Sequence, residues 1–141
     1  MRLSTKGRYG IRLMIDLASN YADRPVLLKD IAKRQDVSEK YLWHLIDSLK
    51  IAGLVNSTRG ARGGYSLAKL PSQISLKDIV LATEGDLSVV ECVGNPSLCE
   101  RSDTCVSFDI WKEISDKISE TLSNISLQQM VERQREKMKQ A

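Results

Sequence analysis

Three cysteines stand close together in the second half of the chain, and thiol side chains are strong metal ligands. Cys92, Cys99 and Cys105 follow the spacing C-x6-C-x5-C. Soft thiolates are the ligands that iron–sulfur clusters and zinc prefer. Turn-forming residues at 94–97 and 102–103 predict that the three cysteines share one loop. This concentration of thiols predicts a metal site whose ligands are these three residues.

The predicted metal site lacks a fourth ligand of the usual kind in its own segment. The spacing differs from that of a zinc ribbon, which has two C-x2-C pairs, and the only histidine, His44, lies far away in the sequence. Two other states stay open: all three thiols are free, or two of them form a redox disulfide. The remaining local donors are the oxygens of Glu91, Glu100, Asp103, Ser107 and Asp109.

A second distinctive segment is rich in arginine and glycine. Residues 59–64 read Arg-Gly-Ala-Arg-Gly-Gly and lie between two predicted strands, 54–58 and 65–67. Glycines let a backbone approach DNA closely, and the negative potential of a minor groove attracts guanidinium groups. A plain turn stays possible, whereas a phosphate loop would need a helix directly after the glycines. We therefore predict a basic β-hairpin that contacts DNA through Arg59, Gly60 and Arg62.

The segments before this hairpin are predicted to be helical. Apolar residues recur every three or four positions at 5–21 and 38–52, and a shorter helix with Ile31 and Ala32 facing inward fits 29–35. Ser38 is a good N-cap for the third helix, and Gly53 suits the left-handed position after its end. Two short helices joined by a tight turn form a helix-turn-helix, and a hairpin after them makes a winged helix. The predicted fold class is mainly α with a small β wing.

The polar face of the third helix is predicted to enter a DNA major groove. Early residues of such a recognition helix reach base edges, while hydroxyl and lysine groups reach phosphates. Trp43 is unusual in this region, because its ring could either contact a thymine methyl group or complete the core. The predicted DNA-binding residues outside the hairpin are Lys6, Ser38, Lys40, Tyr41 and His44.

Charge divides the chain into two parts of opposite sign. The 141 residues carry 21 Lys and Arg against 18 Asp and Glu, a net charge of +3. Residues 1–83 contribute +7 and residues 84–141 contribute −4. A basic first part suits a partner with phosphates, such as nucleic acid, although a merely solvated surface would carry the same charges.

The second half of the chain predicts a long helix that joins two subunits. After a short helix at 76–83, a helix at about 107–124 carries an apolar stripe that the rest of the chain is too short to cover, so the stripe predicts a dimer seam. Packing against the winged helix is the alternative. The tail at 127–141 is expected to turn Leu127, Met130 and Val131 inward, then to become polar and fray. The predicted regions are a DNA-binding domain (1–83), a cysteine loop (84–106) and a dimerisation helix with its tail (107–141). The stripe consists of Trp111, Ile114, Ile118, Leu122 and Ile125.

The chain resembles the iron–sulfur cluster regulator family of the IscR type. The resemblance covers nearly the whole chain and rests on the opening MRLSTKGRY, Tyr41-Leu42, Gly53-Leu54-Val55, the wing at 59–65 and the three cysteines. It implies a dimeric bacterial winged-helix transcription factor. It also implies a [2Fe–2S] cluster bound by Cys92, Cys99 and Cys105.

The chain departs from the family's pattern at two places in the cysteine segment. The first pair of cysteines is one residue wider than the family's C-x5-C-x5-C, and Phe108 stands where the family has a histidine ligand. Because phenylalanine cannot bind iron, the fourth ligand would be a nearby carboxylate, a residue of the partner subunit or an exogenous molecule. Trp43 also replaces a glutamate of the family, so its DNA target preference does not carry over.

These observations predict a cytoplasmic homodimeric repressor that binds a pseudo-palindromic double-stranded DNA site and senses iron–sulfur or redox status. The sequence shows no signal peptide, no membrane-spanning run and no nucleotide-binding glycine motif. One alternative has the same fold with a zinc, thiol or partner-enzyme sensor of the cysteine-metabolism type. Another is a module that binds proteins and not DNA. A cysteine enzyme is disfavoured, because no histidine or acid pair stands ready to activate a thiol.

Overall fold

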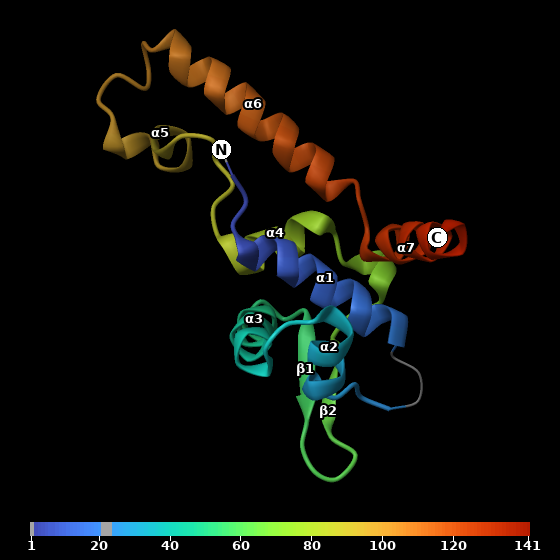
Figure 1. Cartoon of the computed structure of the whole chain (residues 1–141). Coiled ribbons are helices and arrows are strands. Elements are labelled where there is room, and N and C mark those ends of the chain that lie inside the picture. The colour runs from blue at the N-terminus through green and yellow to red at the C-terminus, as the bar shows by residue number, and fades with distance from the viewer. Residues whose placement is uncertain (1, 21–23) are drawn as a thin grey trace.

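The computed structural model describes residues 2–20 and 24–141 and consists of helices and one small hairpin that projects at one end (Figure 1). Tyr21, predicted as the end of the first helix, lies outside the described residues. The elements are α1 (Thr5–Asn20), α2 (Leu28–Gln35), α3 (Glu39–Ile51), β1 (Val55–Thr58), β2 (Gly64–Leu67), the 3₁₀ turn η1 (Pro71–Gln73), α4 (Leu76–Glu84), α5 (Glu91–Gly94), the 3₁₀ turn η2 (Pro96–Leu98), α6 (Val106–Ser123) and α7 (Leu127–Gln140).

The hydrophobic core lies between the first four helices and α7. Residues spaced three or four apart bring one face of each helix inward, as the sequence pattern predicts. Ser38 caps α3 by accepting a hydrogen bond from the Tyr41 backbone N–H, and Gly53 takes the predicted left-handed conformation with φ of 76°. Leu13, Met14, Leu17, Ile31, Leu42, Leu45, Ile46, Leu49, Leu54, Val55, Ile74, Ile79, Leu127, Met130 and Val131 are buried in this core.

A buried ion pair holds α2 against α1. The Asp16 carboxylate, 5% exposed, receives the Arg34 guanidinium at 2.7 Å and the Gln35 side-chain amide at 2.8 Å. Arg12 donates to the Gln35 backbone carbonyl at 2.8 Å, so it caps the C-terminal end of α2. These contacts set the position of α2, and α2 in turn supports α3.

Strands β1 and β2 form the wing in an antiparallel register, with Val55 opposite Leu67 and Thr58 opposite Gly64. Val26 adds a short bridge to β2, because its N–H and its carbonyl each bond Tyr65 at 2.8 Å. Gly64 has φ of 147°, and a Cβ there would lie 2.6 Å from the Val26 carbonyl oxygen, so only glycine fits. The predicted winged helix, mainly α with a small β wing, is confirmed.

The second half differs from the predictions in two places. The cysteine segment contains the short helix α5 and the turn η2, so it is not simply a loop. The tail does not fray, since α7 continues to Gln140 behind a capping box formed by Ser126 and Gln129. Its regularity follows from Leu127, Met130 and Val131, which are buried as predicted and anchor the helix in the core.

Helix α6 runs from the cysteine segment back towards α7 (Figure 1). The connection between α6 and α7 is held by two backbone bonds, from Leu76 N–H to the Ile125 carbonyl at 2.7 Å and from Leu127 N–H to the Ile74 carbonyl at 2.8 Å. None of the helices in the described ranges is both long and apolar enough to cross a bilayer.

Candidate nucleic-acid interface and cysteine segment

The face of α3 that points away from the core is polar except for one large ring. Lys40, Trp43 and His44 are all exposed, and Trp43 is 52% exposed. The Trp43 and His44 rings meet edge to face, with centroids 5.3 Å apart. The structure therefore leaves Trp43 outside the core. Ser38 lies at the start of this face, where its oxygen accepts the Tyr41 N–H and its O–H remains able to donate.

Tyr41 joins α3 to the start of α1. Its half-buried ring packs edge to face on Tyr9 with centroids 5.8 Å apart, and its hydroxyl donates to Thr5 Oγ1 at 3.1 Å. The Arg12 guanidinium lies 4.8 Å from the centroid of the Tyr9 ring. Sequence spacing could not reveal the Thr5 contact, because the two residues are 36 positions apart.

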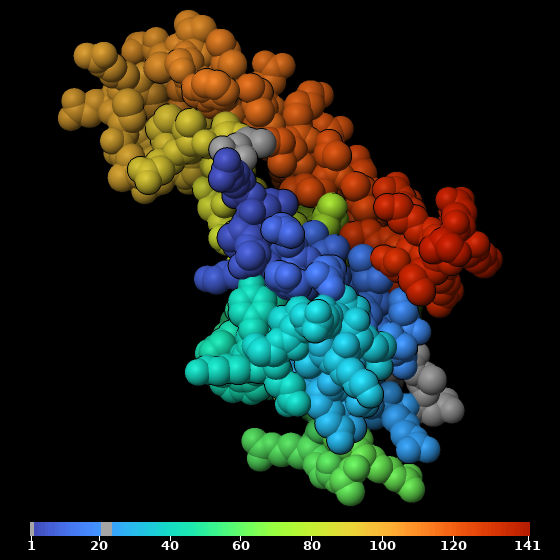
Figure 2. Space-filling view, viewed as in Figure 1, coloured from blue at the N-terminus to red at the C-terminus, as the bar shows by residue number. Residues whose placement is uncertain are grey.

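The wing presents its arginines to solvent. Arg59, Gly60 and Arg62 are exposed in the turn between β1 and β2, and Gly60 has φ of 103°. Figure 2 shows this turn as a green projection beyond α2 and α3. Within the described part of the chain, neither guanidinium group forms an ion pair, so both are available to an anionic partner.

Glu84, at the end of α4, caps the start of α1 across 80 residues of sequence. One carboxylate oxygen accepts from the Ser4 N–H and hydroxyl at 2.7 Å each and from the Gly7 N–H at 3.0 Å. The bond from the Ser4 hydroxyl is the main cause that lowers the pKa of Glu84, with Lys6 nearby adding to it. A Cβ at Gly7 would lie 2.8 Å from that oxygen. Lys6, a predicted DNA contact, is thus placed by a residue that the sequence analysis missed.

The three cysteines occupy three different local settings. Cys92 lies within α5, Cys99 directly follows η2, and Cys105 is the residue before α6. All three are half-buried free thiols. No three His, Cys, Asp or Glu side chains in the described residues are arranged to hold a metal ion. The donor types suit an iron–sulfur cluster or zinc, whereas their arrangement in this single subunit is not a formed site.

The cysteine segment lies at the opposite end of the subunit from the wing (Figure 1). It is connected to the winged helix through Gly85, which has φ of 85° and directly follows Glu84. On its other side it packs on α6, where the Val89 N–H donates to the buried Ser115 hydroxyl at 3.1 Å. Phe108 is half-buried one turn beyond Cys105.

Helix α6 has an apolar surface that is only partly covered. Trp111 is 41% exposed and Ile114 is 38% exposed, while Ile118, Leu122 and Ile125 are half-buried. Val106 and Ile110, which the predicted stripe omits, are also exposed. Val106, Ile110 and Ile114 follow one another at spacings of four, so the two extra residues extend the same surface.

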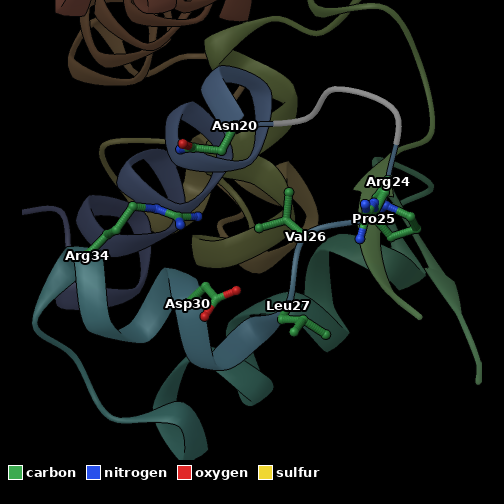
Figure 3. Close-up of a pocket in the computed structure, with 7 residues that line it drawn as sticks. All are labelled: Asn20, Arg24, Pro25, Val26, Leu27, Asp30 and Arg34. Carbon is green, nitrogen blue, oxygen red and sulfur yellow. The ribbon is translucent and has the colours of Figure 1, made fainter. Parts of the chain in front are cut away.

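A hollow of about 460 Å³ lies between the end of α1 and the start of α2 (Figure 3). Asn20, Arg24, Val26, Asp30 and Arg34 are among its lining residues. The Arg34 guanidinium is paired with Asp16, and Asn20 donates to the Asp16 carbonyl at 2.8 Å. Of these two contacts, the pair between Arg34 and Asp16 joins α2 to α1, whereas the Asn20 bond lies within α1.

The comparisons with known proteins agree on one family. Residues 3–133 match the Rrf2 family, described as an iron-dependent transcriptional regulator. The HTH-type transcriptional regulator IscR of Photorhabdus laumondii is 39% identical over 134 residues, which cover 95% of this chain and 81% of that protein.

Solved structures agree with this match. CymR, described as the global cysteine regulator of B. subtilis, is 38% identical with a TM-score of 0.76, and the match covers 94% of this chain and 98% of that one. IscR of T. potens is 40% identical with a TM-score of 0.75, covering 94% of this chain and 88% of that one.

Proposed function

The chain belongs to the Rrf2 family of transcriptional regulators, and from that premise we propose that it is a homodimeric repressor that senses iron–sulfur or redox status. The observation that carries the DNA-binding part of this proposal is the combination of an exposed polar face on α3 with two exposed wing arginines, neither of which forms an ion pair with any residue that the structure describes. A helix of this kind enters a major groove, and arginines beside it suit the adjacent minor groove.

The DNA contacts divide by chemistry. Lys40 and His44 lie where α3 would meet base edges or phosphates, and Lys6 at the start of α1 suits a phosphate. Arg59 and Arg62, with Gly60 between them, would follow the minor groove. Ser38 and Tyr41 already have contacts inside the protein, so we assign them the task of orienting α3 as well as binding phosphate.

The apolar surface of α6 supports a dimer. Trp111 and Ile114 expose about two fifths of their surface, and such contiguous apolar area on a soluble protein marks an interaction site. A second copy of α6 would cover it along Trp111, Ile114, Ile118, Leu122 and Ile125. A two-fold symmetric protein implies a pseudo-palindromic site with half-sites about one helical turn or more apart.

The cysteine segment is proposed as the sensor. Cys92, Cys99 and Cys105 would hold the cluster, which supplies one-electron redox chemistry when bound. Holding it would require the three thiols to come together, and a fourth donor must come from a nearby carboxylate, the partner subunit or an exogenous molecule. Such ordering would act on the segment that begins at Gly85, next to the carboxylate that caps α1.

A second sensor chemistry is supported by a specific observation. The structurally similar CymR is described as a cysteine regulator. A zinc site, a thiol switch or a docked enzyme of cysteine metabolism would use the same fold and the same DNA interface. The two proposals differ only in what the cysteine segment binds.

Anaerobic purification followed by iron, sulfide and zinc assays and a visible spectrum distinguishes these sensors. We expect iron and sulfide in equal amounts with charge-transfer bands, and their loss in Cys99→Ser but not in Ser97→Ala, a control in the same segment. Zinc without sulfide would overturn the cluster. DNA binding is tested separately by salt-dependent footprinting of the same preparation. Equal affinity of cluster-containing and cluster-free protein for all DNA sites would refute the sensing role.

A further inference from the structure

Trp43 is the largest apolar side chain on the outer face of α3, and nothing in the subunit explains its position. It is 52% exposed, although four other apolar residues of this helix, Leu42, Leu45, Ile46 and Leu49, are fully or almost fully buried. One exposed apolar residue is ordinary on a protein surface. This one stands in the second turn of the helix whose first turns would meet DNA bases.

The neighbours of Trp43 limit the motion of its ring. The His44 ring packs edge to face against it, with centroids 5.3 Å apart and planes at 79°. Glu39, Lys40 and Asp47 lie on the same outer side of the helix and are exposed. An aromatic ring has few rotatable bonds, so it loses little entropy when a partner covers it. The ring is therefore suited to contact another surface.

The chemistry of the major groove limits what this ring can recognise. Base edges there offer hydrogen-bond donors and acceptors, and the C5 methyl group of thymine is the one apolar group among them. An indole ring has a broad apolar surface and a single N–H donor. Among the groups on the base edges, a thymine methyl is thus the one whose burial against Trp43 contributes most to the binding free energy.

We infer that Trp43 is a specificity-determining residue that selects a thymine in each half-site by covering its methyl group. The inference rests on the proposed DNA-binding function. It adds a base preference that comes from apolar contact, whereas Lys40 and His44 supply polar contacts. Removing one methyl group from such a contact is expected to weaken binding about fourfold, from the transfer free energy of about 0.8 kcal/mol per methylene.

The test compares thymine with deoxyuridine, which differs only by that methyl group. The probe is the tightest-binding duplex recovered by the wild-type full-length protein from a random pool. Each thymine is then replaced singly by deoxyuridine, and dissociation constants are measured for wild type, Trp43→Ala and Trp43→Phe. We expect one position per half-site where wild type loses about fourfold in affinity, where Trp43→Ala loses nothing, and where Trp43→Phe loses an intermediate amount.

The control is Ile51→Ala, which removes an 81% exposed apolar side chain from the last turn of the same helix. It should keep the wild-type pattern of deoxyuridine effects. If every deoxyuridine effect is the same in wild type and Trp43→Ala, the role of Trp43 is refuted while the DNA-binding function stands. If wild type selects no sequence from the pool, the proposed function itself fails, and the inference falls with it.

Discussion

The ion pair between Asp16 and Arg34 should contribute much more to stability than the other ion pairs of the described residues. Asp16 is 5% exposed and receives bonds from Arg34, from the Gln35 amide and from Asn20. The bond to Asp16 is also the main cause that raises the pKa of Arg34. In Asp16→Ala the guanidinium loses its partner, and α2 loses its attachment to α1.

The size of the loss follows from the burial of the two partners. Removing one member of a buried pair destabilises a protein by roughly 3–5 kcal/mol. The Arg34 side chain is 37% exposed, so water can solvate it again, and this places the expected loss near the lower end, about 3 kcal/mol. For a chain of this length that corresponds to a melting temperature lower by about 10 °C.

Thermal unfolding followed by circular dichroism at one protein concentration measures this loss. The matched control is Asp116→Ala, which breaks the 2.8 Å pair with Lys112 on the solvent side of α6. Because both partners of that pair are exposed, the control should have the same melting temperature as the wild type. Equal melting temperatures for Asp16→Ala and Asp116→Ala would refute the reasoning that burial decides the effect.

Three further predictions concern the DNA interface, the cap of α1 and the dimer. Arg59→Ala should weaken DNA binding and reduce the magnitude of the slope of log affinity against log salt by about one. Arg135→Ala on α7 should change neither quantity. Equal slopes for the two variants would contradict the wing contact. The pKa of Glu84 in the folded protein is lowered, so its stabilisation is present above the ordinary glutamate pKa of 4.5 and is lost as pH falls through the folded value. The difference in unfolding free energy between wild type and Glu84→Gln, from urea titrations, should therefore shrink on acidification, and a constant difference would exclude the charged cap. Ile114→Glu should yield monomers in sedimentation velocity, because it places a charge in the apolar surface of α6. Lys117→Ala, which places no charge there, should remain dimeric. A dimeric Ile114→Glu would show that the dimer interface lies on another surface.

Local patterns were sufficient to predict most of the winged helix. The spacing of Leu42, Leu45 and Leu49 predicted the buried face of α3, and Ser38 marked its start. The glycines and arginines at 59–64 predicted the wing. These predictions succeeded because capping, turns and amphipathic spacing depend on residues only a few positions apart.

Prediction was weaker where distant contacts decide the conformation. The polar end of α7 suggested a fraying tail, yet the anchoring of Leu127 and Val131 in the core maintains the helix. The turn-forming residues around Cys92 suggested a loop, and a short helix forms there. For α7, packing of its buried residues against the core outweighed the polar tendency of the tail.

The sequence by itself determined the winged helix, the basic wing, the polar face of α3 and the presence of three thiols in one segment. Only the tertiary structure showed that Trp43 stays outside the core, that Glu84 caps α1, and that Tyr41 bonds Thr5. It also showed that, within the residues it describes, the three thiols do not form a finished site in one subunit. The physical reason is that residue types and spacing specify local structure and donor chemistry. Which distant groups meet, and how closely, depends on how all the elements pack together.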